Sequence, residues 1–491
     1  MIIVELKGHD YLYQVKDVIK LFFENNTVEE KKQVLKNKSG IVIYTELKKK
    51  ENQFELETII LNDGISCYKN AHQFEPFSPI DESEEKALKR EVKRELYIAL
   101  SKYTHQEFPW GFLTGIRPAK LVHKLLNKEL NYREIEKIFQ KYYFVSREKT
   151  QLLFDIAKRE KEILDYTKPH MISIYIGIPF CKSRCLYCSF TSNPIDKYKN
   201  SVSYYIKALK AEIKGVKQII KEKGYQVQSI YIGGGTPTSI DKIHLEELLT
   251  EVEKTFELNN LSEYTLEAGR PDSITREKLS LIKKYSVNRI SINPQTMNNK
   301  TLKMIGRKHS SKDIIKSFHM AREIGFKNIN MDVIAGLPDE TIMDFHKTIK
   351  DIKTLNPESL TVHTMAVKRA SKLTENNGII DFTPNKETPL MINMASEYAK
   401  EMKMHPYYLY RQKNMAGKLE NIGYSKKGFE STYNIQIMEE KQSIIALGAG
   451  GITKIVYPND DSIKRSFNVK SVELYIDSVD EMLKRKKSLM L

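Results

Sequence analysis

Residues 172–190 read Ile-Ser-Ile-Tyr-Ile-Gly-Ile-Pro-Phe-Cys-Lys-Ser-Arg-Cys-Leu-Tyr-Cys-Ser-Phe. The apolar run at the start of this stretch predicts a strand over Ile172–Ile178, and three cysteines follow it within eight residues of one another. A loop of this length can place Cys181, Cys185 and Cys188 around one face of an iron–sulfur cubane, for which thiolates are suitable soft, charged donors. Three ligands for four irons leave one iron open for chemistry. The spacing therefore predicts a [4Fe–4S] cluster.

Zinc is the alternative metal for clustered thiolates. A structural zinc site needs four ligands, and the remaining cysteine, Cys67, lies in a different predicted domain. His309 or His363 could supply the fourth ligand instead. Disulfides are disfavoured, because the N-terminus lacks the basic start and cleavage site of a secretion signal.

Composition places the chain among ordinary globular proteins. Its 491 residues are 41% hydrophobic and 29% charged, which suits two or three folded units. No stretch approaches the roughly 18 uncharged apolar residues of a membrane span, so we expect a cytoplasmic protein without one.

The net charge of +16 comes from lysines spread along the whole chain. We therefore expect no nucleic-acid partner, and a basic surface equally suits an anionic small molecule or an acidic electron-donor protein.

The strand before the cysteines is the first of six that alternate with helices. Right-handed crossovers between such strands produce a parallel sheet, here predicted to curl into a partial (β/α)6 barrel with its chemistry at the carboxyl ends of the strands. The predicted strands are Ile172–Ile178, Gln228–Ile232, Glu263–Glu267, Arg289–Asn293, Asn328–Ile334 and Ser359–Thr364. The predicted helices include Ser203–Lys221, Asp241–Thr255, Ser311–Ile324 and Ile342–Leu355.

Four segments make up the predicted α/β organisation. They are a small α/β domain (1–80), a helical segment (81–168), the barrel (169–370) and a C-terminal α/β extension (371–491). In the first, strands are predicted at Ile2–Leu6, Gly40–Leu47 and Phe54–Leu61, with a helix at Tyr11–Phe23. The extension has glycine-rich turns around Gly448–Gly451 and a final helix near Val472–Lys484.

A second motif, Ile232-Gly-Gly-Gly-Thr-Pro-Thr238, lies at the end of the second barrel strand. Consecutive glycines let the backbone approach a ligand closely, because no Cβ stands in the way. A plain turn is the alternative interpretation of a single glycine run. Its position at a strand end, next to the cysteine loop, favours ligand binding.

Together these two motifs resemble those of the radical S-adenosylmethionine (SAM) superfamily. The resemblance implies that the open iron chelates the amino and carboxylate groups of SAM. One electron passed through the cluster would then cleave the sulfonium into methionine and a 5′-deoxyadenosyl radical. It also implies that Gly234, Gly235 and Thr236 hold the SAM amino group and that Tyr187 lies near the adenine.

Within that superfamily the chain is similar to the oxygen-independent coproporphyrinogen III oxidases, also called coproporphyrinogen dehydrogenases, from Tyr175 to about Gly451. The resemblance implies a further set of SAM-binding positions. They are Tyr175, Glu267, Gln295, Arg307, Asp332, which suits the ribose hydroxyls, and Ala366. Each residue alone could instead be a salt-bridge partner, a turn residue or a surface charge; no catalytic side chain is assigned.

The most specific match is to the HemZ-type branch of this family. It rests on Trp110–Pro118, Glu267–Asp272, Tyr408–Gly417 and Glu420–Tyr424. The implied reaction of this SAM-dependent enzyme is the oxidative decarboxylation of coproporphyrinogen III to protoporphyrinogen IX in anaerobic haem synthesis. A substrate with four carboxylates needs basic anchors. The candidates are Arg270, Arg369, Arg411, Lys413 and Lys418.

One position departs from the characterised dehydrogenases, which carry a fourth cysteine two residues after the third. Here that residue is Phe190, and in this respect the chain resembles the haem-chaperone, HemW-like branch. Relatives that methylate haem and open its ring share the same motifs. The expected partners are thus a tetrapyrrole, either coproporphyrinogen III or haem, and a small electron-donor protein.

Overall fold

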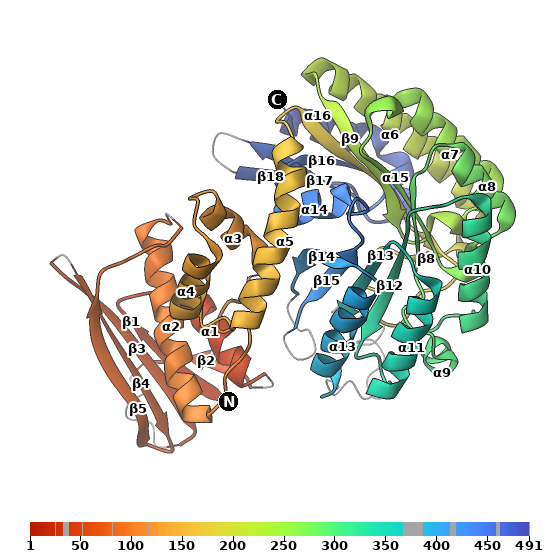
Figure 1. The fold of residues 1–491 in the computed structure, drawn as a ribbon. Coiled ribbons are helices and arrows are strands. Elements are labelled where there is room, and N and C mark those ends of the chain that lie inside the picture. Colours follow the sequence, from red (N-terminus) through yellow and green to blue (C-terminus); the bar gives the residue numbers. More distant parts are fainter. Residues whose placement is uncertain are drawn as a thin grey trace. The chain divides into compact units, whose positions relative to one another are not determined.

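The computed structural model describes most of the chain, in two compact units, Met1–Ala157 and Lys158–Leu491 (Figure 1). Our finer division into four segments stays a prediction. Three of the candidate anchors, Arg369, Lys413 and Lys418, lie outside the described residues. The described residues are 1–24, 26–32, 39–51, 53–80, 82–115, 117–366, 386–412, 419–457 and 462–490.

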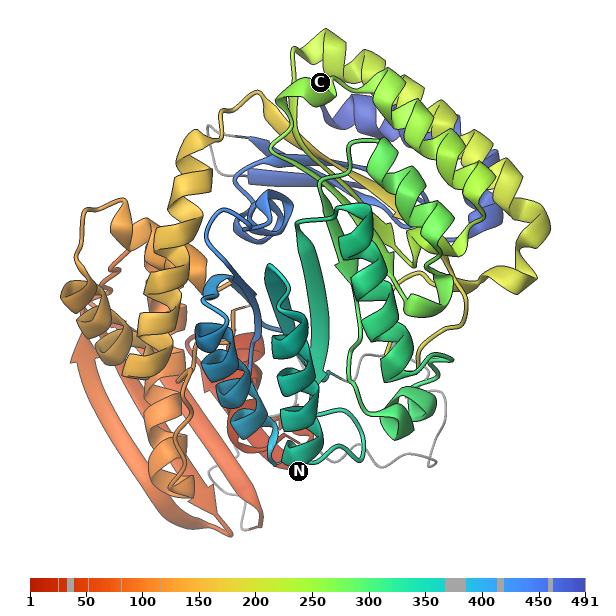
Figure 2. The same cartoon turned by 45° about the vertical axis from the view of Figure 1, so that its right-hand side comes forward.

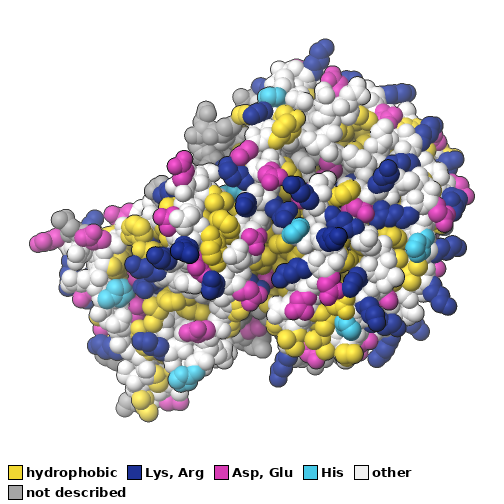
Figure 3. Space-filling model, in the orientation of Figure 1, with side chains coloured by type: hydrophobic (Ala, Val, Ile, Leu, Met, Phe, Trp, Pro, Cys, Tyr) yellow, Lys and Arg dark blue, Asp and Glu magenta, His cyan; other side chains and the backbone are white. Residues whose placement is uncertain are grey.

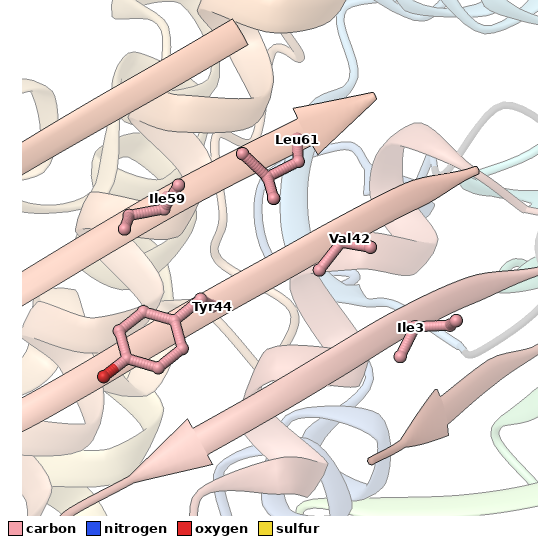
Figure 4. Packing of buried hydrophobic residues seen from close by; sticks show 5 residues of the cluster. All are labelled: Ile3, Val42, Tyr44, Ile59 and Leu61. Carbon is pink, nitrogen blue, oxygen red and sulfur yellow. The ribbon is translucent and has the colours of Figure 1, made fainter. Parts of the chain in front are cut away.

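The first unit contains a five-stranded sheet in the order β2-β1-β3-β4-β5. Strand β1 (Ile2–Lys7) pairs in parallel with β2 (Val28–Glu30) and β3 (Ile41–Lys50), while β4 (Gln53–Asn62) and β5 (Ile65–Phe74) continue antiparallel. Successive side chains of a strand point to opposite faces. On one face, five buried residues of β1, β3 and β4 pack together (Figure 4): Ile3, Val42, Tyr44, Ile59 and Leu61.

Helices complete the first unit. Helix α2 (Glu84–Thr104) packs against β4, β5 and α1 (Leu12–Phe22). Helices α3 (Ala119–Leu126) and α4 (Tyr132–Tyr143) follow, and α5 (Arg147–Tyr166) contains the boundary between the units. The predicted first strand and first helix are confirmed.

The second unit is built on parallel strands that are neighbours in the same order as in the sequence. They are β6 (Met171–Ile178), β9 (Gln226–Gly234), β10 (Glu263–Gly269), β11 (Arg289–Ile292), β12 (Ile329–Ala335) and β13 (Ser359–Thr364). The connecting helices line one face of the curved sheet (Figures 1 and 2). They include α6 (Val202–Lys223), α7 (Lys242–Thr255), α8 (Arg276–Lys284), α10 (Ser311–Ile324) and α11 (Ile342–Leu355). The predicted partial barrel is confirmed.

The C-terminal extension lengthens this sheet at both edges, to eleven strands among the described residues. At one edge β16 (Ser443–Leu447) pairs in parallel with β6, followed by antiparallel β17 (Ile452–Tyr457) and β18 (Ser462–Phe467). At the other, β15 (Asn421–Ser425) pairs antiparallel with β13 and with β14 (His405–Tyr410). The extension is therefore part of the barrel sheet.

In the described part of this extension, four helices accompany the sheet. Helix α13 (Thr388–Glu401) packs on α11, and α14 (Thr432–Glu439) packs on β14 and β9. The predicted final helix near Val472–Lys484 is wrong as one element. It is two helices, α15 (Val472–Asp477) and α16 (Val479–Leu489), because Ser478 leaves the helical conformation with φ −123° and ψ 21°. No helix in the described parts of the chain is apolar over a stretch long enough to cross a membrane.

Candidate cofactor site

The three clustered cysteines lie in one loop, residues 181–190, which we call the cluster loop. It follows β6, and its base is closed where β7 (Phe180–Cys181) pairs with β8 (Asn193–Pro194). All three cysteines are free thiols; Cys181 and Cys185 are buried and Cys188 is half-buried. The backbone N–H of Cys188 donates to the carbonyl of Cys185 at 3.1 Å, which turns the loop back on itself.

The thiols influence one another electrostatically. Burial raises the pKa of Cys181 to about 12; a hydrogen bond with Thr236 lowers it, and the charges of Cys188 and Cys185 raise it further. Burial likewise raises the pKa of Cys188. Thiolates rather than thiols bind metal, so metal binding here must release protons. Cys181 and Cys188 therefore hold their protons more tightly than free thiols do, and a bound cluster would displace those protons.

The three sulfurs are not gathered as a single zinc ion would require. Around one tetrahedral zinc with Zn–S bonds of about 2.3 Å, thiolates stand roughly 3.8 Å apart. The sulfurs of the three cysteines, all within the described residues, do not lie within 4.8 Å of one another. His309 Nδ1 lies 3.7 Å from Asp272 and His363 Nε2 lies 3.8 Å from Asp332, so each candidate fourth ligand faces a carboxylate.

The glycine motif packs directly against the start of the cluster loop. The N–H of Gly235 donates to the carbonyl of Ile178 at 2.8 Å, and that of Thr236 to Phe180 at 2.7 Å. A Cβ at Gly235 would lie 2.6 Å from the Phe180 oxygen, and Gly234 has φ +107°, so side chains are excluded at both positions. Thr236 Oγ1 lies 3.4 Å from Cys181 Sγ. A bound ammonium group can only donate hydrogen bonds. Its acceptors in the glycine motif would therefore be backbone carbonyls and Thr236 Oγ1.

Tyr175 and Glu267 lie beside the glycine motif, within a group of stacked tyrosines. The Tyr175 ring stacks on Tyr231 and Tyr433 at centroid distances of 6.3 and 6.2 Å, and the latter two stack at 4.5 Å. Tyr231 O–H donates to Glu267 Oε1 at 2.5 Å. Burial raises the pKa of Glu267 to about 7, although the Tyr231 hydrogen bond lowers it. Sequence reasoning missed Tyr231 and Tyr433; Tyr433 lies on α14, and no local signal links it to the barrel strands.

Arg307 and Tyr187 join the cluster loop to the segment after α9 (Asn299–Met304). Arg307 Nη1 donates to the carbonyl of Asn293, and Nη2 donates to Tyr187 Oη at 3.2 Å. The Tyr187 ring packs against an apolar cluster that includes Ile305 and Met365. Leu186 N–H donates to the Ile305 carbonyl at 3.2 Å. Tyr187 therefore has a packing role, whatever else it binds.

Gln295 and Asp332 are held together across adjacent strand ends. Gln295 N–H donates to the Asp332 carbonyl at 2.9 Å, and Gln295 adopts φ +67°, a conformation unusual for a residue with a Cβ. The Asp332 carboxylate accepts from Asn330 Nδ2 at 2.7 Å. Burial would raise its pKa, but His363 and Asn330 outweigh burial and the pKa is lowered, so Asp332 stays ionised. Tyr410 Oη lies 3.2 Å from the other ring nitrogen of His363.

These contacts bring most of the predicted site residues into one connected region at the strand ends. Thr236 links the glycine motif to Cys181, Arg307 links Tyr187 to the strand ends, and Asp332 raises the pKa of Glu267 through its charge. Ala366 is half-buried just after β13. Ligand binding by these positions stays a prediction.

Arg270 is placed differently from our expectation, and its prediction as a substrate anchor is wrong. The residue is buried, forms two hydrogen bonds with Asp272 and donates to Ser183 in the cluster loop, so its guanidinium faces the loop rather than open space. Arg411 is also buried; burial lowers its pKa to about 10, and Glu420 opposes that change.

Known proteins resemble this chain along most of its length. A family model described as the radical SAM superfamily matches residues 175–352. The oxygen-independent coproporphyrinogen-III oxidase-like protein HemZ of Bacillus subtilis is 41% identical over 81% of this chain and 81% of its own. The haem chaperone HemW of the same organism is 32% identical over 63% of this chain and 76% of its own.

A solved structure, that of the radical SAM enzyme coproporphyrinogen III oxidase (HemN) from Escherichia coli, has a similar fold. It aligns with a TM-score of 0.51 and 21% identity, over 66% of this chain and 72% of that one. At this identity the likeness concerns the fold.

Proposed function

Because this chain belongs to the radical SAM superfamily and, within it, to the HemZ-type oxygen-independent coproporphyrinogen III oxidase family, we propose that it decarboxylates coproporphyrinogen III to protoporphyrinogen IX. The cofactors of the superfamily are a [4Fe–4S] cluster and SAM; when bound, they supply the carbon radical that an unactivated propionate C–H bond requires. Each propionate that becomes a vinyl group loses CO2, one hydrogen atom and one electron. A small electron-donor protein and a final electron acceptor complete the reaction.

The observation that carries this proposal is the meeting of the cluster loop with the glycine motif at the strand ends. Cys181, Cys185 and Cys188 would hold the cluster. The glycine motif, next to Cys181, would hold the SAM amino group through its hydrogen-bond acceptors. Arg307, whose guanidinium donates to Tyr187 of the cluster loop, would pair with the SAM carboxylate.

Asp332 and Glu267 are the two carboxyl groups of this region, and they differ in charge state. Asp332 stays ionised and can accept hydrogen bonds from ribose hydroxyls. The Glu267 carboxyl has a pKa of about 7 and can keep its proton below neutral pH. It accepts a hydrogen bond from Tyr231, so that both groups have fixed orientations.

The tetrapyrrole substrate is recognised by its carboxylates. Lys and Arg side chains are distributed over the face of the molecule seen in Figure 3 and are mixed with acidic groups. These positive charges attract anions over a wide part of the surface. This attraction suits both a polycarboxylate substrate and an acidic electron donor.

Haem delivery is the second candidate function, and Phe190 favours it. In the characterised dehydrogenases a cysteine occupies that position, while the HemW-like branch lacks it. The 32% identity to a haem chaperone is consistent with this alternative. A chaperone would bind haem stoichiometrically without consuming SAM.

An anaerobic assay of the reconstituted protein separates the candidates. Protein, SAM and a reductant are incubated with coproporphyrinogen III or with haem, and products are identified by mass spectrometry. The proposal expects loss of two CO2 from coproporphyrinogen III together with 5′-deoxyadenosine, and no product from Cys185→Ala. Stoichiometric haem retention without SAM cleavage would favour the chaperone. Consumption of haem with SAM cleavage would instead indicate methylation or ring opening.

A further inference from the structure

Arg270 lies directly after β10, and its guanidinium is buried beneath the cluster loop; only 3% of the residue is exposed. Nη1 donates to the carbonyl of Ser183 at 2.8 Å and to its hydroxyl at 3.0 Å. The same nitrogen lies 3.7 Å from Cys185 Sγ, within hydrogen-bond distance of sulfur. A permanent positive charge therefore faces one of the three thiols.

The other side of the guanidinium is fixed by a carboxylate. Nε and Nη2 donate to the two oxygens of Asp272 at 3.0 and 2.8 Å. Bidentate pairs of this kind fix the orientation of an arginine as well as its position. Asp272 is itself 3.7 Å from His309 Nδ1, and the Ser183 hydroxyl also donates to the Gly306 carbonyl at 2.9 Å. The Nη1–Sγ contact is thus held in place by Asp272 on the arginine side and by Ser183 on the side of the cluster loop.

A hydrogen bond from a cation to a cluster thiolate favours the reduced cluster. With three thiolates, a [4Fe–4S] cluster carries one more negative charge after it accepts an electron. A cationic donor stabilises the more negative state to a greater extent, and hydrogen bonds to cluster sulfurs are one of the factors that set reduction potentials. Burial strengthens this effect, because little water screens the charge.

We propose that Arg270 is a positioning residue of the cluster site, which donates a hydrogen bond to the Cys185 thiolate and raises the reduction potential of the cluster. The inference rests on the proposed binding of the cluster by the three cysteines. It gives Arg270-Pro-Asp272, which follows the Glu267 strand end, a role in electron entry rather than in substrate binding.

The test measures the cluster without SAM and without turnover. Wild type, Arg270→Gln and Arg270→Lys are reconstituted anaerobically, and iron per chain and the midpoint potential are measured by redox titration followed by electron paramagnetic resonance. For Arg270→Gln we expect about a tenfold lower ratio of reduced to oxidised cluster at a fixed potential, equivalent to a shift of about 59 mV. Arg270→Lys keeps the charge and should shift less. Ser183→Ala, which loses the hydroxyl contacts alone, should keep the wild-type potential.

A fourth variant keeps the inference testable if Arg270→Gln loses its cluster. Asp272→Asn leaves the charge of Arg270 uncompensated, so its cluster should be easier to reduce than that of the wild type. If Arg270→Gln binds full iron and its midpoint potential is unchanged, the proposed role of Arg270 is wrong. If Arg270→Gln loses its cluster, an unchanged midpoint potential in Asp272→Asn has the same meaning. Neither result affects the assignment of the cysteines. Retention of four irons by Cys185→Ala would instead overturn the cysteine assignment.

Discussion

Arg307 and Asp332 offer the most direct test of SAM binding at the scale of single residues. Loss of a charge-assisted hydrogen bond costs about 1.5–3 kcal/mol, or roughly ten- to a hundredfold in affinity. We expect Arg307→Ala and Asp332→Ala to weaken SAM binding by this factor while iron content stays the same. Anaerobic calorimetry beside thermal melting measures both properties.

Arg322→Ala is the matched control for these two variants. Arg322 lies on α10 and pairs with Glu358 at 2.8 Å, so its loss should lower the melting temperature without changing SAM affinity. If Arg307 and Asp332 only stabilise the fold, their variants will behave like this control. Unchanged SAM affinity in both well-folded variants would remove them from the site and weaken the assignment of Glu267 and Gln295.

Glu267 should make the stability of the cofactor-free protein depend on pH. Its pKa is about 7 in the folded protein and 4.5 as a free side chain. The folded state therefore holds this proton more tightly, so its contribution to stability is fully present below pH 4.5 and is lost as pH rises to 7. Glu267→Gln keeps an acceptor for Tyr231 and removes the titration. We expect its melting temperature to gain a few degrees relative to the wild type between pH 5 and pH 8; parallel curves would contradict this.

Phe190 tests whether the missing fourth cysteine matters. Its side chain is 68% exposed, so Phe190→Cys should not disturb packing or iron content. If the cysteine only supports the reaction in relatives, decarboxylation rates should change modestly. Decarboxylase activity that appears only in the variant would show that the natural protein is not the dehydrogenase. Phe190→Ser controls for loss of the aromatic ring.

Residues in short motifs could be predicted from the sequence, whereas residues that act across the fold could not. The three cysteines lie within one short segment, and Gly234–Thr236 lie within another. In each motif, the spacing of the residues along the chain limits how far apart they can be in space. The contact of Arg270 with the cluster loop could not be predicted, because its partner Ser183 lies 87 residues away. Nothing near Tyr433 indicates that it stacks on Tyr231.

At the scale of secondary-structure elements, Glu212 on α6 connects the barrel to the last two helices. Its carboxylate accepts hydrogen bonds from Lys486 Nζ at 2.7 Å, Tyr475 Oη at 2.6 Å, Asn468 Nδ2 at 2.8 Å and Gly448 N–H at 2.8 Å. Glu212 and Lys486 are almost fully buried. Removing one partner of a buried pair costs about 3–5 kcal/mol, because the other charge is left uncompensated.

We therefore expect Glu212→Ala to lower the melting temperature strongly. In Glu212→Gln with Lys486→Met no buried charge remains, so part of the loss should be recovered. Lys353→Ala is the control: it breaks an ion pair with Glu401 that is about half exposed, which is worth at most about 1 kcal/mol. Equal effects of Glu212→Ala and Lys353→Ala, measured by thermal melting, would contradict this role of Glu212.

Helix limits were predictable where the chain caps itself. The predicted helices Ser311–Ile324 and Ile342–Leu355 agree with the structure, since capping boxes at Ser310 and Thr341 fix their starts. Strand β16 was not predicted as part of the barrel, because it pairs with β6 more than 260 residues earlier in the chain. Strand β5 was missed as well; its residues alternate between exposed and half-buried and give no apolar signal.

At the scale of the whole molecule, the two ends of the chain should differ in their importance for the site. All predicted cofactor residues lie in the unit Lys158–Leu491, and within it the extension pairs with both outer barrel strands, β6 and β13. A chain that begins at Lys158 keeps the end of α5, where Arg159 lies 3.6 Å from Glu430 and Ile163 packs near Tyr407. We expect this shorter chain to bind about four irons.

Removal of residues 371–491 should have the opposite effect. It would expose β6 and β13 as unpaired edges, and exposed edges of buried strands promote aggregation. It would also leave the Glu212 carboxylate without Lys486 and take Tyr433 away from Tyr231. We expect little soluble protein and no stable cluster, as measured by soluble yield and iron per chain after anaerobic reconstitution. Four irons in the chain without its extension, or none in the chain that begins at Lys158, would show that this division of roles is wrong.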